Sequence, residues 1–153
     1  MKTMSPKPTT PTFTTPEDAE SAFYEAVEQS NLDRLMAVWS DDDEVVCVHP
    51  NGQRLTGHAA IRESWRAILS SGRRLRVDLA RSVRWTSMLM SVHSVLEQVT
   101  IDGEEGGETG TLTLAATNVF VRGADGWRLL SHHSSAIAES GDNEPPGPPR
   151  VLH

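Results

Sequence analysis

Residues 110–138, which read GTLTLAATNVFVRGADGWRLLSHHSSAIA, decide the fold of this chain. Two runs rich in β-branched and aromatic residues, 110–122 and 127–138, flank the short segment Gly123-Ala124-Asp125-Gly126. Runs of this kind joined by a glycine-containing turn are typical of two antiparallel strands. The sequence therefore predicts a β-hairpin at the end of the folded part of the chain.

The strand pattern continues upstream of this hairpin. Residues 74–85 and 87–101 have the same character, with a turn at Thr86-Ser87 between them and a longer turn from Asp102 to Gly110 after them. The second half of the chain is therefore predicted to be an antiparallel meander. Long strands of this kind coil and bend. We expect helices to cover the concave side of the bent sheet.

The first half of the chain has helical periodicity instead. Thr15-Pro16-Glu17-Asp18 is a helix start, because Thr15 can cap, Pro16 suits the first turn and the two acids favour the positive end of the helix dipole. Second and third helices are predicted after Asn31 and Gly57, with short strands at 45–49 and 54–56 between them. Helices followed by a run of strands predict an α+β fold.

Composition bounds the domain and its partners. Residues 1–14 and 139–153 are polar and rich in proline, so they are predicted to be disordered tails around one domain at 15–138. The net charge of −7 argues against nucleic acid and anionic membrane as partners, and no apolar stretch is long enough to span a bilayer. A single cysteine excludes an internal disulfide and fits a cytoplasmic location. No nucleotide or flavin fingerprint is present, and no cofactor is expected.

Three blocks of sequence carry a family resemblance. They are WSDDDEVVCVHP at 39–50, GHAAIRESW at 57–65 and ATNVFVRGADGWRLLSHHSS at 116–135. Over 15–138 the chain resembles the nuclear transport factor 2-like (NTF2-like) superfamily, which includes ketosteroid isomerases and SnoaL-like polyketide cyclases. The resemblance implies a cystatin-like roll with a cone-shaped pocket, and a homodimer formed through the convex face of the sheet. It implies little about activity, since this superfamily hosts enzymes, binders and assembly domains.

The resemblance places His49 where ketosteroid isomerases have their aspartate base, directly before a proline. Strand alternation puts Val45, Cys47 and His49 on one face, which by the resemblance lines the pocket. Histidine titrates near neutral pH, so His49 can act as a general base. An equally open interpretation is a core histidine bonded to a backbone carbonyl.

Asn118, with Thr117 as the alternative register, aligns near the acid that holds the oxyanion in ketosteroid isomerases. Its amide can donate a hydrogen bond to such an oxygen, or it can simply pair with its neighbours. The position of the catalytic tyrosine holds Phe23. Tyr24, one residue on, is expected to point elsewhere because one helical step turns a side chain by about 100°. Steroid isomerase activity is therefore not predicted.

Further pocket residues follow from the same resemblance and from alternation. His133 shares a strand face with Trp127 and Leu129, so it is expected to point inward as a second polar group beside His49. The face of His93 is open. No metal is expected, because the histidines lack a carboxylate at ligand spacing. The predicted ligand contacts are Phe23, Trp39, Cys47, Trp65, Leu129 and Ser131.

The leading hypothesis is an enzyme without a cofactor. His49 would be the base, and Asn118 and His133 would donate hydrogen bonds to a developing enolate. The substrate would be a small, largely apolar carbonyl compound undergoing isomerisation, cyclisation or dehydration. Two alternatives remain: a non-catalytic protein that binds a small hydrophobic molecule, and a dimeric assembly domain that uses the convex sheet face.

Overall fold

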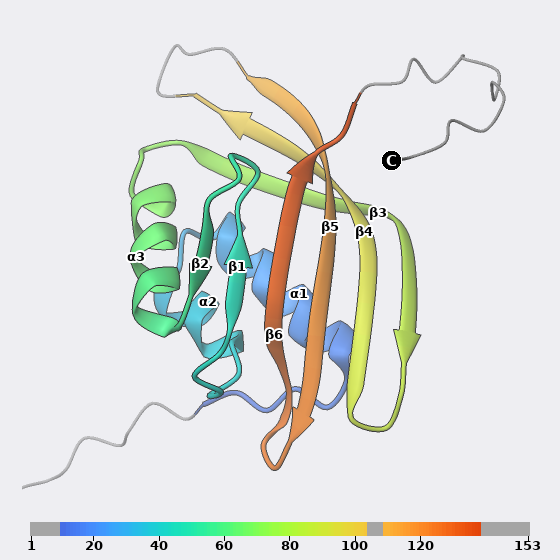
Figure 1. The fold of residues 1–153 in the computed structure, drawn as a ribbon. Coiled ribbons are helices and arrows are strands. Elements are labelled where there is room, and N and C mark those ends of the chain that lie inside the picture. The colour runs from blue at the N-terminus through green and yellow to red at the C-terminus, as the bar shows by residue number, and fades with distance from the viewer. Residues whose placement is uncertain (1–9, 104–108, 139–153) are drawn as a thin grey trace, which may run out of the picture.

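The computed structural model describes residues 10–103 and 109–138 of the chain. These residues form three helices and six strands, and they confirm the predicted α+β fold (Figure 1). No helix within them is both long and apolar enough to cross a bilayer. In chain order the elements are α1 (Pro16–Glu28), α2 (Leu32–Val38), β1 (Val46–Val48), β2 (Arg54–Thr56), α3 (His58–Leu69), β3 (Arg74–Thr86), β4 (Met90–Asp102), β5 (Gly110–Gly123) and β6 (Gly126–Ala136).

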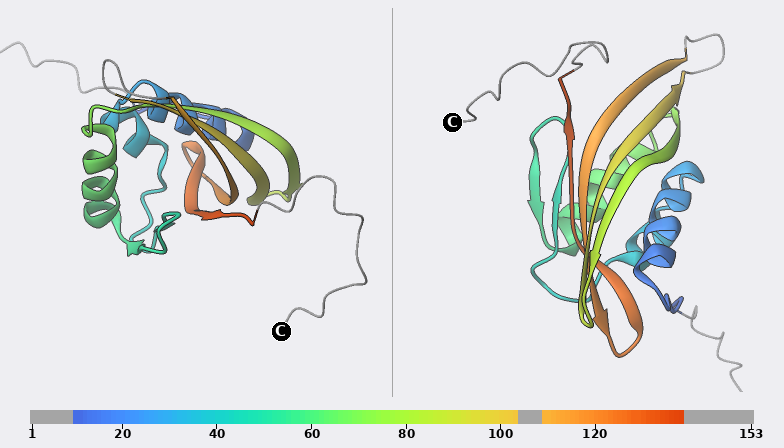
Figure 2. Two further views of the ribbon diagram at one scale, coloured as in Figure 1. Left: turned by 90° about the horizontal axis from the view of Figure 1, so that it is seen from above. Right: turned by 90° about the vertical axis from the view of Figure 1, so that its right-hand side faces the viewer.

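The strands form one sheet in the order β2-β1-β6-β5-β4-β3. Neighbouring strands are antiparallel except for β1 and β6, which run parallel. The predicted meander of β3 to β6 is thus confirmed, although β4 begins at Met90 because the backbone N–H of Ser87 closes a tight turn on the Met90 carbonyl at 2.7 Å. The sheet is strongly curved and α1 lies across its concave side (Figure 2).

Helix α1 presents an unusually wide buried face to this curved sheet. Its N-terminus is capped as predicted, with the Thr15 hydroxyl accepting from the Asp18 backbone N–H at 3.0 Å. Because the sheet wraps around the helix, neighbouring positions such as Phe23 and Tyr24 are both buried, at 1% and 5% exposed. Tyr24 was expected to point elsewhere than the predicted pocket, and this expectation is wrong, because Tyr24 lines the cavity described below. The buried residues of α1 are Pro16, Ala19, Glu20, Phe23, Tyr24, Ala26 and Val27.

A β-bulge in β6 decides which of its residues face inward. Val119 pairs with Ser131 while Phe120 pairs with Leu129, so Leu130 is an extra residue in β6. An extra residue reverses the alternation beyond it. Leu129 is buried before the bulge and His132 after it, whereas His133 is exposed. The prediction that His133 shares the inward face of Leu129 is therefore wrong.

The folded part of the chain begins earlier than predicted. Phe13 is buried, and its carbonyl accepts a hydrogen bond from the Trp127 backbone N–H at 2.9 Å. Gly126, with φ of +91°, lets the two segments approach, because a Cβ there would overlap the Phe13 backbone. The predicted boundary at residue 15 is thus at least two residues late. The rest of the predicted tails, 1–9 and 139–153, lies outside the described residues.

Candidate functional site

A cavity of about 200 Å³ lies between the helices and the concave side of the sheet. An engineered cavity of about 150 Å³ is large enough for benzene, so this one suits a compound built on a single ring. Its walls are mostly apolar, which is the usual character of a small-molecule site. The apolar lining residues are Val27, Pro50, Trp65, Ile68, Leu75, Val77, Val99, Ile101, Leu112 and Leu114. The residues that we call the polar lining are Tyr24, His49, Glu97, His132 and Ser134.

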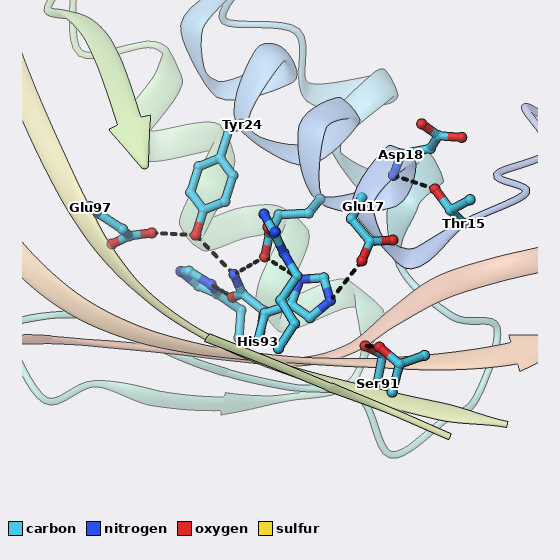
Figure 3. Close-up of polar contacts among 12 residues, drawn as sticks. Thr15, Glu17, Asp18, Tyr24, Ser91, His93 and Glu97 are labelled. Carbon is cyan, nitrogen blue, oxygen red and sulfur yellow. Dashed lines mark hydrogen bonds and ion pairs between the residues drawn. The ribbon is translucent and has the colours of Figure 1, made fainter. Parts of the chain in front are cut away.

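Glu97 connects two hydroxyl groups of the polar lining. The Tyr24 hydroxyl donates to Oε2 of Glu97 at 2.7 Å (Figure 3), and the Ser134 hydroxyl donates to Oε1 at 2.7 Å. Burial raises the pKa of Tyr24 well above its ordinary value, and the nearby charge of Glu97 raises it further. Tyr24 therefore keeps its proton and remains the donor to Glu97.

Asn118 lies behind the polar lining and holds three of its neighbours in place. It is 1% exposed, whereas Thr117 is exposed, so Asn118 is the residue that faces inward. Its Nδ2 donates to the Tyr24 hydroxyl at 3.0 Å and to Oε2 of Glu20 at 3.2 Å, while its Oδ1 lies 2.6 Å from Nδ1 of His132. Both N–H groups of the amide are thus engaged by neighbours. Asn118 is a positioning residue in this arrangement.

Glu20 anchors the far side of this network. Glu20 is 2% exposed, and its Oε2 also lies within hydrogen-bond distance of Nδ1 of His93, at 2.8 Å. His93, whose face the sequence left open, is fully buried, with Nε2 at 4.0 Å from Glu17 (Figure 3). Arg84 lies 3.7 Å from Oε1 of Glu20. The helix and the sheet are therefore joined by charged and polar groups at the centre of the concave face.

His49 lines the cavity, and its inward orientation agrees with the prediction. It is 6% exposed, and its ring meets the Trp65 ring edge-on at 5.1 Å between centroids. Nε2 lies 3.0 Å from the Ser64 hydroxyl, which itself donates to the Ile61 carbonyl at 2.8 Å. Burial lowers the pKa of His49, so the neutral ring that accepts protons predominates at neutral pH.

The other predicted ligand contacts are placed differently. Trp65 lines the cavity, but Phe23, Trp39, Cys47 and Leu129 are packed in the core, and Ser131 is half-buried beyond the bulge. The Cys47 sulfur lies 3.8 Å from Nε2 of His49, but burial raises its pKa to about 12. Cys47 therefore stays a thiol and is a poor nucleophile.

Sequence reasoning missed most of the polar network: Glu20, Tyr24, His93, Glu97, His132 and Ser134. Glu20 and Tyr24 are four residues apart on one helix face, which is a weak signal for a shared environment. The alternation in β4 does not show which face of the strand is the inner one, because both faces mix apolar and polar residues. As for metals, no group of three histidine, cysteine, aspartate or glutamate residues in 10–103 and 109–138 is arranged to hold an ion.

The fold is similar to that of solved structures described as having a cystatin-like fold. The sequence profile of the SnoaL-like domain family matches residues 17–139. The chain belongs to this family.

Solved structures agree with this assignment. A candidate calcium/calmodulin-dependent protein kinase type II association domain from Thiobacillus denitrificans is 39% identical, with 84% of this chain and 99% of that chain covered and a TM-score of 0.68. A candidate dehydratase of the NTF2-like family from Streptomyces avermitilis is 27% identical, with 78% and 91% covered and a TM-score of 0.73. An NTF2-like superfamily protein from Salmonella enterica, 19% identical with 84% and 92% covered and a TM-score of 0.69, shares the fold. No curated protein matches the chain.

Replacing Asn118 with leucine should destabilise the protein strongly. The change leaves Nδ1–H of His132 without its acceptor and removes donors from Glu20 and Tyr24, all of them buried. Each unsatisfied buried group costs about 1–3 kcal/mol, so we expect a loss of about 2–5 kcal/mol in the free energy of unfolding in urea. Thr117→Val, on the exposed face of the same strand, should change it by less than about 0.5 kcal/mol. Equal effects would contradict the network.

Stability should fall as the pH drops below about 6.5, the ordinary pKa of histidine. Burial lowers the pKa of His132 in the folded protein, so below this pH the unfolded chain binds a proton that the folded chain does not. The contribution of His132 to the free energy of unfolding is complete above about pH 6.5. As the pH falls from there towards the lower pKa of His132 in the folded protein, the free energy of unfolding decreases by up to about 1.4 kcal/mol per pH unit. Urea unfolding at about pH 7.5 and about pH 5.5 measures this loss. His132→Asn should reduce it and His133→Asn should not.

Proposed function

We propose that this protein is a cofactor-independent acid–base enzyme acting on a small, largely apolar carbonyl compound. One observation carries the proposal: His49, kept neutral by a burial-lowered pKa, lines the same apolar cavity as the Tyr24–Glu97 pair. A neutral imidazole in a cavity of one-ring size is suited to remove a proton from a bound molecule. The largely apolar walls would reduce the access of water to that step.

The geometry suggests how His49 would act. Since the Ser64 hydroxyl donates to the Ile61 carbonyl, its oxygen is free to accept from Nε2–H of His49. That hydrogen bond leaves the lone pair of Nδ1 to take the substrate proton. The sequence-based assignment of hydrogen-bond donors needs revision, however. Asn118 has no free N–H and His133 points outward, so neither is proposed as a donor to an enolate.

Dehydration is the reaction with the most support among those that begin with proton removal. The 27% identical protein from Streptomyces avermitilis is described as a candidate dehydratase. In a β-hydroxy ketone, a base removes the proton next to the carbonyl, the carbon–oxygen bond breaks and a double bond forms. The proton taken by His49 then leaves with the hydroxide as water, so the enzyme returns to its starting state without a cofactor. Isomerisation and cyclisation start with the same proton removal.

The proposal predicts turnover of 3-hydroxycyclohexanone, a one-ring β-hydroxy ketone, to cyclohexenone. The absorbance of the conjugated product gives the rate, and deuterium uptake from heavy water into recovered substrate detects proton removal alone. His49→Gln should lower the rate by a factor of about 10² or more, because general bases contribute about 10²–10⁴.

His133→Gln is the matched control, because His133 is an exposed histidine on β6, and this variant should keep the wild-type rate. Binding of the compound without turnover or deuterium uptake would contradict the enzyme proposal. It would favour the alternative of a non-catalytic protein for small hydrophobic molecules.

Assembly through the convex face is a second candidate function. The 39% identical protein from Thiobacillus denitrificans is described as a candidate association domain. The outward positions at the centre of β4 and β5 hold no charged residue, which suits a face covered by a second copy of the chain. These positions are Val92, Ser94, Leu96, Thr113, Ala115, Thr117, Val119 and Val121.

The assembly proposal predicts a dimer in sedimentation velocity at micromolar concentration. Val119→Glu would place a charge in the interface of each copy and should shift the protein to a monomer, because an unpaired buried charge is costly. Asp78→Lys, an exposed change on β3, should leave the dimer intact. A wild-type monomer at this concentration would contradict the proposal without affecting the proposed chemistry.

A further inference from the structure

The hydroxyl donors of the polar lining are already engaged within the protein. The Tyr24 and Ser134 hydroxyl protons both go to Glu97. With its two oxygens occupied in this way, Glu97 draws both hydroxyls towards itself. A ligand entering the cavity therefore meets oxygens whose protons point elsewhere.

The proton of His132 can be assigned from its neighbours. Nδ2 of Asn118 faces the Glu20 carboxylate, which only accepts, and the Tyr24 oxygen, whose own proton goes to Glu97. The amide is thus fixed in one orientation, and its Oδ1 faces Nδ1 of His132 at 2.6 Å. An oxygen acceptor at that distance requires a proton on Nδ1. A neutral imidazole carries one proton, so Nε2 of His132 has a free lone pair.

The remaining lining groups follow the same pattern. Nε2 of His49 is directed at the Ser64 oxygen. The indole N–H of Trp65 has no hydrogen-bond partner among the residues that the structure describes, but its nitrogen is buried, so it is not presented to a ligand in the cavity. Nε2 of His132 has no hydrogen-bond partner among residues 10–103 and 109–138, and it belongs to a ring that lines the cavity. The lining is therefore rich in free acceptors and poor in free donors.

We infer that Nε2 of His132 is a hydrogen-bond acceptor for the ligand, and that the ligand is a one-ring-sized compound carrying a hydroxyl group that donates to it. The inference rests on the proposed function, in which the cavity is the ligand site, and it names the class of ligand. A carboxylate would meet only acceptors, and a plain hydrocarbon would leave Nε2 unpaired. Both are disfavoured by the same hydrogen-bond arrangement.

The two histidines then have separate roles in the proposed dehydration. The substrate hydroxyl donates to His132, which positions the oxygen that leaves. His49 removes the proton next to the carbonyl and passes it to that oxygen, so water departs and both imidazoles are neutral again. The substrate carbonyl would point away from the polar lining, because the polar lining has no free hydrogen-bond donor for its oxygen.

The tautomer of His132 tests the inference without a ligand. Long-range ¹H–¹⁵N correlation spectra of the ¹⁵N-labelled full chain at neutral pH distinguish protonated from unprotonated ring nitrogens, and the His132→Asn variant assigns the signals. We expect a protonated Nδ1 and an unprotonated Nε2. A proton on Nε2, alone or in a charged ring, would overturn the assignment.

Binding of phenol and toluene, which differ by a hydroxyl in place of a methyl group, tests the ligand class. Titration calorimetry of the wild type should show phenol binding about tenfold more tightly or better, since a site built around a hydroxyl rejects an analogue without one. His132→Asn keeps an N–H for Oδ1 of Asn118 but removes Nε2, so it should abolish the preference. His133→Asn should retain it.

The outcomes separate this inference from the proposed function. Equal affinity of the wild type for phenol and toluene would overturn the hydroxyl assignment while leaving the cavity as a ligand site. No binding of either compound would overturn both. A phenol preference that persists in His132→Asn would show that another group receives the hydroxyl, and would overturn the role of His132.

Discussion

The side-chain amide of Asn118 is the contact on which the site depends. It joins Glu20 and Tyr24 of α1 to His132 of β6 through three hydrogen bonds, all of them buried. Amides are suited to this position because they donate on one side and accept on the other. The Glu20 carboxylate, which accepts from Nδ2 of Asn118, fixes the orientation of the amide. The amide oxygen then requires a proton on Nδ1 of His132. The helix, the sheet and the cavity lining are thus held in one arrangement by a single strand residue.

The register of the sheet brings these groups into a row. His93 pairs with Asn118, Asn118 with His132, and His132 with Cys47, so four strands contribute one inward residue each. The bulge at Leu130 makes this row possible, because without it the alternation from Leu129 would bring His133 inward instead. One inserted residue therefore selects which of two adjacent histidines enters the core. The rest of the row is set by ordinary strand pairing.

This dependence explains what sequence can and cannot predict here. Turn residues and periodicity are sufficient for the helices and the meander, because these follow from local pattern. The inward face of His49 came from the family resemblance, since alternation alone does not say which face of a strand is the inner one. The bulge has no glycine or proline to mark it, so strict alternation assigned His133 to the wrong face. Tyr24 was misplaced for a different reason: a curved sheet buries more of a helix than the usual apolar stripe. Glu97 was missed because Val95 and Leu96 make both faces of β4 equally plausible as the inner one.

Burying two carboxylates in a small core costs desolvation free energy, and apolar residues of similar size often stabilise a protein as well or better. Glu20 and Glu97 are 2% and 5% exposed, yet each accepts hydrogen bonds from two side chains. The two carboxylates fix the direction of the hydrogen bonds, because each one accepts and its neighbours must donate. An apolar core would leave the ring of His132 free to take either tautomer. The buried charges are thus better explained by control of a proton at the cavity than by stability.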